Sequence, residues 1–552
     1  MIKSLFRRKT NFHYESEHEL HKVLNVRDLT FFGIAAIIGG GIFSSIGQAC
    51  YEGGPGVIFL FIICAVACGF AALCYAEFSS RIPVSGSAYT YAYASFGELF
   101  AWIIGWALLM EYSIGNIYIA FSWSGYFTHL LDAMNLHIPR WLITDYKTAS
   151  SVSLIHGTVL NDDELSALQA WKSAPQLGSL KIIFDLPALV INVLITMLVY
   201  RGINESRKTS NAMVILKLAV IILIIVVGAF YIDIENYKPF VPKGFDGIMQ
   251  GVSAVFFTYI GFDAVSTLAE ESKNPQRDLP RGMFYSLIIC TVLYILISLV
   301  LTGMAPYSLL KVDDPLAFVL NYKGIKWLEY VVSISAIIAM TSVLLVFQMG
   351  QPRIWMSMSR DGLLPKAFSN IHPKYKTPGF STIVTGLVVG VPILFTDANF
   401  VLDFTSIGTI FAFILVCGGV LLLPKRDKVA GGFHMPFVNS KFIFPAIIII
   451  TIFITHFNVP NYFDGVLDFG KWDIFNLSHR LMWFFLLVLS AMSYIKEYSL
   501  IPMLGLTTCM YLLTGMKAEN WIWFFIWFLI GLILYFAYGY RKSNLAHGKE
   551  GK

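Results

Sequence analysis

The feature that most constrains this chain is a series of long apolar stretches separated by short polar or glycine-rich segments. Only 14% of its 552 residues are charged, against about 25% in a soluble domain. An apolar stretch of about 20 residues crosses a bilayer as a helix, because a helix satisfies its own backbone groups in lipid. The expected spans are 29–50, 56–79, 99–128, 182–200, 212–232, 246–268, 283–304, 327–350, 380–396, 400–423, 442–457, 481–495, 499–515 and 521–540. The sequence therefore predicts an all-α polytopic membrane protein with about 14 transmembrane helices.

The distribution of Lys and Arg predicts the orientation of the chain. With a cytoplasmic N-terminus, most of the 40 Lys and Arg residues fall on the cytoplasmic side, as the positive-inside rule requires. We therefore expect a protein of the cytoplasmic (plasma) membrane with both termini in the cytoplasm. The expected divisions are a tail at 1–28, a core at 29–424 with an extracytoplasmic loop at 129–181, additional helices at 425–540 and a tail at 541–552. The long loop can serve as a lid or as a spacer.

Several functional classes lack the residues that they need in this sequence. The basic residues form no stripe that would bind nucleic acid. The sequence contains no GxxxxGK[ST] phosphate-binding loop, and its dispersed His, Asp and Glu residues form no acid–base or metal cluster. The seven cysteines lie in or beside apolar stretches, which argues against a disulfide framework. We therefore expect no enzyme activity, no cofactor, no bound metal and no nucleic-acid partner.

Three consecutive glycines interrupt the first expected span. Gly39, Gly40 and Gly41 lie in the middle of FFGIAAIIGGGIFSSIG. Each glycine destabilises a helix interior by roughly 1 kcal/mol relative to alanine, so the triplet predicts a local break. Unwound backbone at this depth is tolerated where it is buried in protein or lines a cavity, and broken helices mark the binding sites of transporters. The alternative is close helix–helix packing through small residues.

The sixth expected span carries a second weak point. Gly261 lies near its middle, and Asp263 follows within the membrane. The two interrupted spans are five spans apart, so they cross the bilayer in opposite directions. Two inverted halves of five helices, each with a discontinuous first helix, form the plan of many secondary transporters. We expect the first ten helices to form such a five-plus-five inverted repeat, with helices 1 and 6 broken.

Four motifs follow one another between Leu24 and Pro436: GIAAIIGGGIF, AEFSSRIPVSGSAYTYAYASFGE, FFTYIGFDAVSTLAEESKNPQRDLPRG and SRDGLLPKAFSNIHPKYKTP. Together they resemble the amino acid–polyamine–organocation (APC) superfamily, most closely its cationic amino acid transporter branch. That branch is similar in having fourteen spans. Many relatives have Gly-Ser-Gly or Gly-Thr-Gly where this chain has Gly39-Gly40-Gly41. A hydroxyl that would contact a substrate carboxylate is therefore missing, and backbone N–H groups alone would make that contact.

The resemblance implies a binding site for an amino acid at the two breaks. It places the substrate carboxylate at the backbone N–H groups of Gly40 and Gly41, where a helix N-terminus favours negative charge. It places the substrate ammonium near backbone carbonyls, and the side chain of Phe257 over the substrate as a gate. A core phenylalanine is the alternative for Phe257. The expected substrate-binding residues are Ile37, Gly39, Gly40, Gly41, Phe257, Thr258, Ile260 and Glu111, with Phe257 and Asp263 as gating residues.

Lys217 is the one basic residue inside an expected span, about six residues into span 5. An ionisable residue inside the membrane is usually functional and paired, although a lysine near a span end can instead extend to the interface. In proton-coupled relatives, a lysine at the matching position occupies the place that sodium takes in sodium-coupled transporters. The resemblance therefore favours coupling to protons through Lys217.

Two acidic residues at membrane depth leave their roles open. Glu111 lies in the middle of span 3, where its carboxylate can bind a cationic substrate side chain or pair with another helix. Asp263 aligns with an acidic gate position in some relatives, and it can instead cap the second half of span 6. The sequence does not decide between the two roles of either residue.

The sequence thus predicts a secondary active amino acid transporter that couples uptake to protons. The branch points towards a cationic amino acid, although it includes members that transport neutral ones. Sodium-independent amino acid exchange is the alternative mechanism, and a channel or a membrane-embedded enzyme is a more distant alternative. The expected partners are an amino acid, protons and the lipid bilayer.

Overall fold

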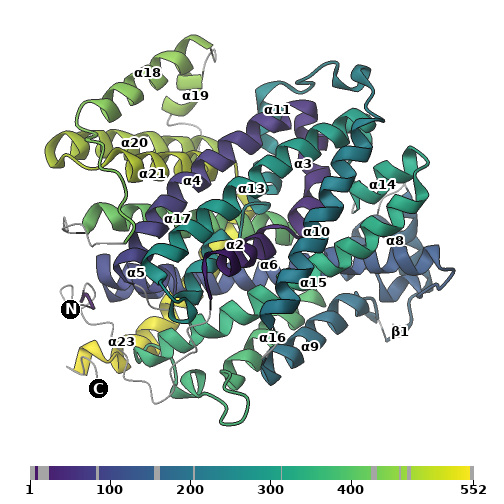
Figure 1. Cartoon of the computed structure of the whole chain (residues 1–552), viewed down its shortest axis with the longest axis horizontal. Coiled ribbons are helices and arrows are strands. Elements are labelled where there is room, and N and C mark those ends of the chain that lie inside the picture. Colours follow the sequence, from purple (N-terminus) through teal and green to yellow (C-terminus); the bar gives the residue numbers. More distant parts are fainter. Residues whose placement is uncertain are drawn as a thin grey trace.

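The protein is a bundle of helices with a small folded loop region at one end (Figure 1). The computed structural model describes residues 7–9, 24–82, 86–154, 162–178, 180–202, 206–312, 314–423, 432–458, 462–468, 474–516 and 518–547. Within those ranges, strand structure is limited to the hairpin of β1 (Gln176–Leu177) and β2 (Leu180–Lys181) and to isolated bridges.

The first half of the chain forms the segments on which the site depends. They are α2 (Val26–Ile37), η1 (Gly41–Ser45), α3 (Ile46–Gly53), η2 (Gly54–Gly56), α4 (Val57–Arg81), α5 (Ala88–Ser95), α6 (Glu98–Ala133), η3 (Arg140–Leu142), α7 (Tyr146–Ser153), α8 (Asp162–Ser173), α9 (Leu186–Arg201), α10 (Ser206–Ala229), η4 (Ile234–Tyr237), α11 (Gly244–Gln250), α12 (Val252–Phe257) and η5 (Phe262–Glu271).

The second half contains longer uninterrupted helices. They are α13 (Pro275–Met304), η6 (Tyr307–Leu309), α14 (Pro315–Tyr322), α15 (Lys326–Arg360), η7 (Lys366–Ser369), α16 (Gly379–Ile393), α17 (Ala398–Leu422), α18 (Ile443–Asn458), α19 (Tyr462–Leu467), α20 (Ile474–Lys496), α21 (Leu500–Thr514), α22 (Ala518–Leu534), η8 (Tyr535–Gly539), α23 (Tyr540–Lys542) and η9 (Leu545–His547).

Eight helical stretches of the described chain are long and apolar enough to cross a membrane. They are Gly41–Arg81, Glu98–Asp132, Asn211–Ala229, Pro275–Met304, Lys326–Arg360, Phe400–Leu422, Asn476–Lys496 and Ala518–Lys542. Shorter apolar helices accompany them at Leu186–Arg201, Ala254–Ala269, Gly379–Ile393, Ile443–Phe457 and Leu500–Thr514. The predicted class of polytopic, helical membrane protein is therefore confirmed.

Burial separates a protein-facing centre from a lipid-facing rim. The most apolar window of α6 is 94% buried, whereas those of α20 and the α22 stretch are 22% buried. The helix α6 lies against α15 and α17, while the C-terminal helices α18, α20 and α21 lie together at one edge of the molecule (Figure 1). Large apolar side chains such as Phe453 and Phe484 remain exposed on that edge, as expected where lipid replaces protein contacts.

The loop predicted at 129–181 has a folded structure of its own. It contains α7, α8 and the β1–β2 hairpin, which enclose a small core of Ala149, Ala174 and Ile183. Asp145 caps α7, because its side chain accepts a hydrogen bond from the backbone N–H of Thr148 at 2.7 Å. Lys147 joins this region to the start of α17 through an ion pair with Asp397 at 2.6 Å. The loop is therefore folded and attached to the helical bundle.

Candidate functional site at two helix breaks

The first break separates α2 from η1. Asn25 caps the start of α2 by accepting hydrogen bonds from the N–H groups of Arg27 and Asp28. The helix ends at Ile37, and Ile38 is extended with φ −82° and ψ 100°. Helical structure resumes with the wide turn η1, which starts at Gly41. The glycine triplet therefore lies at an interruption, where the sequence predicts one.

The backbone after the first break presents unused donors. Among the described residues, the N–H groups of Gly39, Gly40, Gly41 and Ile42 find no backbone acceptor, and the first donated bond comes from Phe43 to the Gly39 carbonyl at 3.2 Å. The first N–H groups of a helix have no partner inside it. Such a group of donors, at the positive end of the helix dipole, suits a carboxylate.

The second break separates α12 from η5. The helix α12 ends at Phe257, and Gly261 has φ +113°. Residues with a Cβ rarely adopt this backbone conformation, so glycine is required there. The chain continues as the tight helix η5, and Asp263 lies in its first turn.

The two breaks are in direct contact. A Cβ added to Gly41 would lie 2.7 Å from the Thr258 Cα, and a Cβ added to Gly261 would lie 2.8 Å from the Ala36 Cβ. A Cβ added to Gly39 would clash with the side chain of Val343. The glycines therefore serve both predicted roles, because they interrupt the helices and also let the two backbones approach each other.

Tyr294 of α13 connects the carbonyl ends of the two breaks. Its hydroxyl lies 2.9 Å from the Ile37 carbonyl oxygen and 2.9 Å from the Thr258 carbonyl oxygen. The side chain is fully buried. The carbonyl of Phe257 accepts a hydrogen bond from the N–H of Ile260 at 3.2 Å. Ile37, Phe257, Thr258 and Ile260 therefore lie together around the junction.

An aromatic pair adjoins the first break. The rings of Phe257 and Tyr118 meet edge to face, with their centroids 4.7 Å apart. A Cβ on Gly40 would lie 3.3 Å from the Tyr118 ring, and the Tyr118 hydroxyl donates to the Ser44 hydroxyl at 3.3 Å. Phe257 is 5% exposed. Tyr118 could not be predicted from the sequence, because nothing in its spacing distinguishes it from the other tyrosines.

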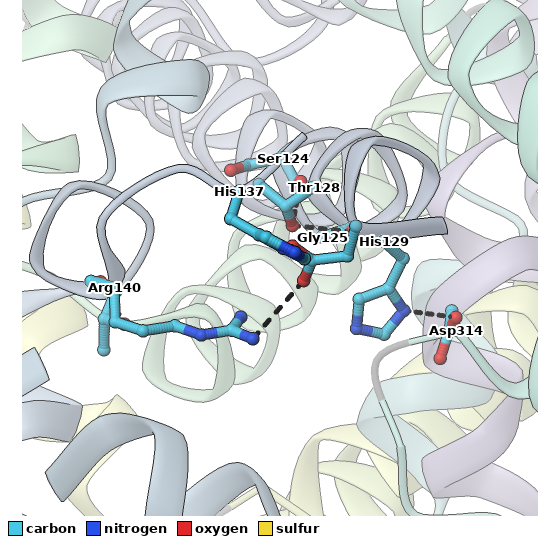
Figure 2. A network of polar contacts seen from close by, with 9 residues as sticks. Ser124, Gly125, Thr128, His129, His137, Arg140 and Asp314 are labelled. Carbon is cyan, nitrogen blue, oxygen red and sulfur yellow. Dashed lines mark hydrogen bonds and ion pairs between the residues drawn. The ribbon is translucent and has the colours of Figure 1, made fainter. Parts of the chain in front are cut away.

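A polar cavity of about 480 Å³ lies on the loop side of this aromatic pair. Its walls include Ser44, Gln48, Tyr118, Arg140, Asp145, Glu164 and Lys311. Figure 2 shows part of its rim, where the His129 Nδ1 lies 2.7 Å from the Asp314 Oδ2. Tyr118 belongs to both the cavity wall and the pair with Phe257. Tyr118 therefore adjoins both the cavity and Gly40.

Lys217 reaches the unwound end of α2. Its fully buried ammonium lies 3.1 Å from the Ala35 carbonyl oxygen, 2.7 Å from the Ile38 carbonyl oxygen and 3.1 Å from the Ser342 hydroxyl. Each of the three N–H bonds of the ammonium therefore has an oxygen acceptor. The ammonium lies inside the protein and does not extend to a membrane surface.

Glu111 and Asp263 are two buried carboxylates that act electrostatically on each other. None of their four oxygens has a hydrogen-bond partner of good geometry within the described chain. The Tyr112 hydroxyl and the Asn116 amide on the same helix as Glu111 are also unpartnered there. Buried polar groups without partners are uncommon and call for a ligand, water or proton. The two carboxylates are therefore candidates to receive a ligand, a water molecule or a proton.

Comparison with known proteins identifies the family of this chain. Residues 24–485 match the family described as amino acid permease, and residues 498–543 match the C-terminal part of that permease family. The chain is 36% identical to the branched-chain amino acid permease BcaP of Bacillus subtilis over 530 residues, which cover 96% of this chain and 95% of that one.

Two further relatives broaden the range of named substrates. The methylthioribose transporter of Bacillus subtilis is 37% identical over 550 residues, covering 99% of this chain and 100% of that one. The cationic amino acid transporter 9, chloroplastic, of Arabidopsis thaliana is 38% identical over 417 residues, covering 75% of this chain and 68% of that one. The predicted resemblance is confirmed: the chain belongs to the amino acid permease family and is a multi-pass membrane transporter, not an enzyme.

Proposed function

We propose that this protein takes up an amino acid across the plasma membrane by secondary active, proton-coupled transport. The observation that carries the proposal is the junction of two broken helices. One break leaves N–H donors unused, and its last carbonyls bind a buried lysine ammonium. Alternating access around such a junction is the working principle of transporters with broken helices.

The junction offers complementary groups to both charges of an amino acid. The N–H groups of Gly40 and Gly41 suit the carboxylate. The carbonyls of Ile37, Phe257 and Ile260 suit the ammonium, and a carbonyl that already accepts one hydrogen bond has a second lone pair for the substrate. In this proposal Gly39 and Thr258 complete the lining. Phe257, together with Tyr118, closes the site towards the polar cavity.

Lys217 is the proposed coupling group. An ammonium has three N–H donors, whereas the neutral amine has two and carries no charge. Loss of the proton therefore weakens the attachment of the α2 end to α10 and α15, which Lys217 provides through Ala35, Ile38 and Ser342. Because Ile38 adjoins both Ile37 and the glycines, protonation of Lys217 and occupancy of the substrate site would act on the same backbone.

Glu111 is the proposed determinant of substrate charge. Its oxygens form no hydrogen bond of good geometry in the described chain, although the Thr409 hydroxyl of α17 acts on its charge, which disfavours the alternative of an ion pair with another helix. A lysine or arginine side chain would offset the desolvation of the carboxylate. Asp263 would respond to the same ligand, because its charge and that of Glu111 act on each other.

The proposal includes an architecture. About 14 spans, with the first ten as a five-plus-five inverted repeat, would form a core at 29–424, followed by additional helices at 425–540. Both tails, at 1–28 and 541–552, would be cytoplasmic. The two breaks support this arrangement, because the helices that carry them, α2–α3 and α11–η5, lie five predicted spans apart.

Transport by purified protein in liposomes tests the function. With unlabelled leucine, arginine or methylthioribose trapped inside, an external labelled amino acid should accumulate transiently by counterflow. An imposed inward proton gradient should drive net accumulation, whereas a sodium gradient should not. Accumulation driven by sodium would contradict proton coupling, and counterflow without any gradient-driven uptake would favour the exchanger. If no amino acid is transported but methylthioribose is, the proposed substrate class is wrong.

A further inference from the structure

Tyr294 holds a single hydroxyl between the two breaks. The distances to the Ile37 and Thr258 carbonyl oxygens are both 2.9 Å. The ring packs against Phe61 and Tyr259, with centroid distances of 5.8 Å and 5.6 Å. These contacts and the full burial of the ring hold the hydroxyl between the two carbonyls.

The two carbonyls depend on this hydroxyl. Ile37 is the last residue of α2, and Thr258 directly follows the end of α12. In the described part of the chain, no backbone N–H donates to either carbonyl. The last carbonyls of a helix have no partner inside it, and a buried carbonyl without a donor is costly. A tyrosine hydroxyl has only one hydrogen to donate, so it satisfies one carbonyl fully or both incompletely.

A substrate ammonium would relieve this shortage. It has three N–H donors, and Ile37 provides one of the carbonyls proposed to bind it. When the ammonium binds the Ile37 carbonyl, the Tyr294 hydroxyl can donate to Thr258 alone. When the site is empty, the same hydroxyl must serve both breaks.

We propose that Tyr294 is a positioning residue that stabilises the empty transporter by joining the two breaks, and that it releases the Ile37 carbonyl to the substrate ammonium. This inference rests on the proposed function. Tyr294 does not contact the substrate in this scheme and acts through the two carbonyls. Its loss therefore impairs the step in which the empty transporter returns across the membrane.

Net uptake and exchange separate this role from a general structural one. Net uptake requires return of the empty transporter, whereas exchange of internal for external substrate does not. In the Tyr294→Phe variant, the rate of proton-driven net uptake should fall about tenfold, the typical effect of one buried hydrogen bond, while exchange stays within about twofold of the wild type. Tyr237→Phe is the matched control. The Tyr237 hydroxyl donates to the carbonyl of Leu299 at 2.8 Å, and Leu299 lies on α13, the helix that also carries Tyr294, but away from the breaks.

The outcomes distinguish the inference from the function beneath it. An equal fall of net uptake and exchange in Tyr294→Phe, with a wild-type Tyr237→Phe, would assign Tyr294 to packing and overturn the inference. Two unchanged rates would overturn it as well. If the wild-type protein itself shows neither flux, the proposed function fails, and the inference fails with it.

A second variant keeps the test decisive if Tyr294→Phe does not fold. Replacement of Tyr294 by 4-aminophenylalanine supplies two N–H donors, one for each carbonyl. The ammonium must then displace a full hydrogen bond, so KM should rise about tenfold while the maximal exchange rate is retained. An unchanged KM would contradict competition between Tyr294 and the substrate for Ile37.

Discussion

The two breaks interrupt their helices by different backbone means. The first uses three successive glycines and an extended Ile38, and no residue from Ile38 to Gly41 has a positive φ. The second uses one glycine, Gly261, with φ +113°. The first arrangement exposes several N–H donors, whereas the second requires a backbone shape that only glycine adopts easily. We infer that the first break supplies the N–H groups for the substrate carboxylate, whereas the second break depends on a backbone conformation that requires glycine.

The largest expected effect comes from filling the first break. In Gly41→Leu, the new Cβ would lie 2.7 Å from the backbone of Thr258, and the side chain would block the N–H groups. Substrate should no longer raise the thermal stability of the protein, and transport should be lost. Gly40→Leu should act similarly by filling the space before Tyr118. Gly69→Leu is the control, since no atom lies within 4 Å of a Cβ at Gly69. Wild-type stabilisation by substrate in Gly41→Leu would contradict a site at this break.

Coupling should depend on the cation that is attached to the first break. In Lys217→Ala, the carbonyls of Ala35 and Ile38 lose their donor, so a proton gradient should no longer drive accumulation while some exchange remains. Ser342→Ala removes one of the three acceptors and keeps both carbonyls, so it should retain coupling. Uptake against a concentration gradient by the Lys217→Ala variant, at a rate near that of the wild type, would show that another group carries the proton.

Sequence reasoning located both breaks because glycine acts through its own backbone. Gly39–Gly41 and Gly261 therefore identify themselves without knowledge of the rest of the fold. The sequence gives no such sign for three other residues, because each contacts a segment that is distant in the sequence. These residues are Tyr118, Tyr294 and Ser342. The folded loop shows the same limit, because its core around Ala149 and Ile183 depends on packing between segments that lie apart in the sequence.

Glu111 should determine whether the protein prefers a substrate with a positively charged side chain. If Glu111 binds a cationic side chain, Glu111→Gln should weaken arginine binding about tenfold to a hundredfold more than alanine binding, which is the range of one charge-assisted hydrogen bond. Competition binding with the two amino acids measures the ratio. Equal losses for both ligands, together with lower thermal stability, would assign Glu111 to structure. Loss of neither would indicate a substrate without a positive side chain, as the name of the branched-chain relative suggests.

The most direct comparison of the two breaks adds one methyl group to each, in the variants Gly261→Ala and Gly39→Ala. Their effects should be the smallest of those predicted. In Gly261→Ala, the Cβ would meet the Ala36 Cβ at 2.8 Å and its backbone carbonyl at 3.1 Å, at a φ that alanine rarely adopts. Strain of this kind costs about 1–3 kcal/mol, so the melting temperature and the transport rate should both fall, the rate about tenfold.

In Gly39→Ala, the three atoms nearest to the new methyl group all belong to the side chain of Val343, which must shift, and Gly39 has no positive φ. A side chain can shift more easily than a backbone, so transport should stay within about threefold of the wild type, and the loss of stability should be smaller than in Gly261→Ala. Thermal unfolding and initial uptake rates of the two variants, measured side by side, check the difference. A larger loss of transport and stability in Gly39→Ala than in Gly261→Ala would contradict this comparison of the two breaks. The first break would then be the one whose backbone conformation is more sensitive to an added methyl group.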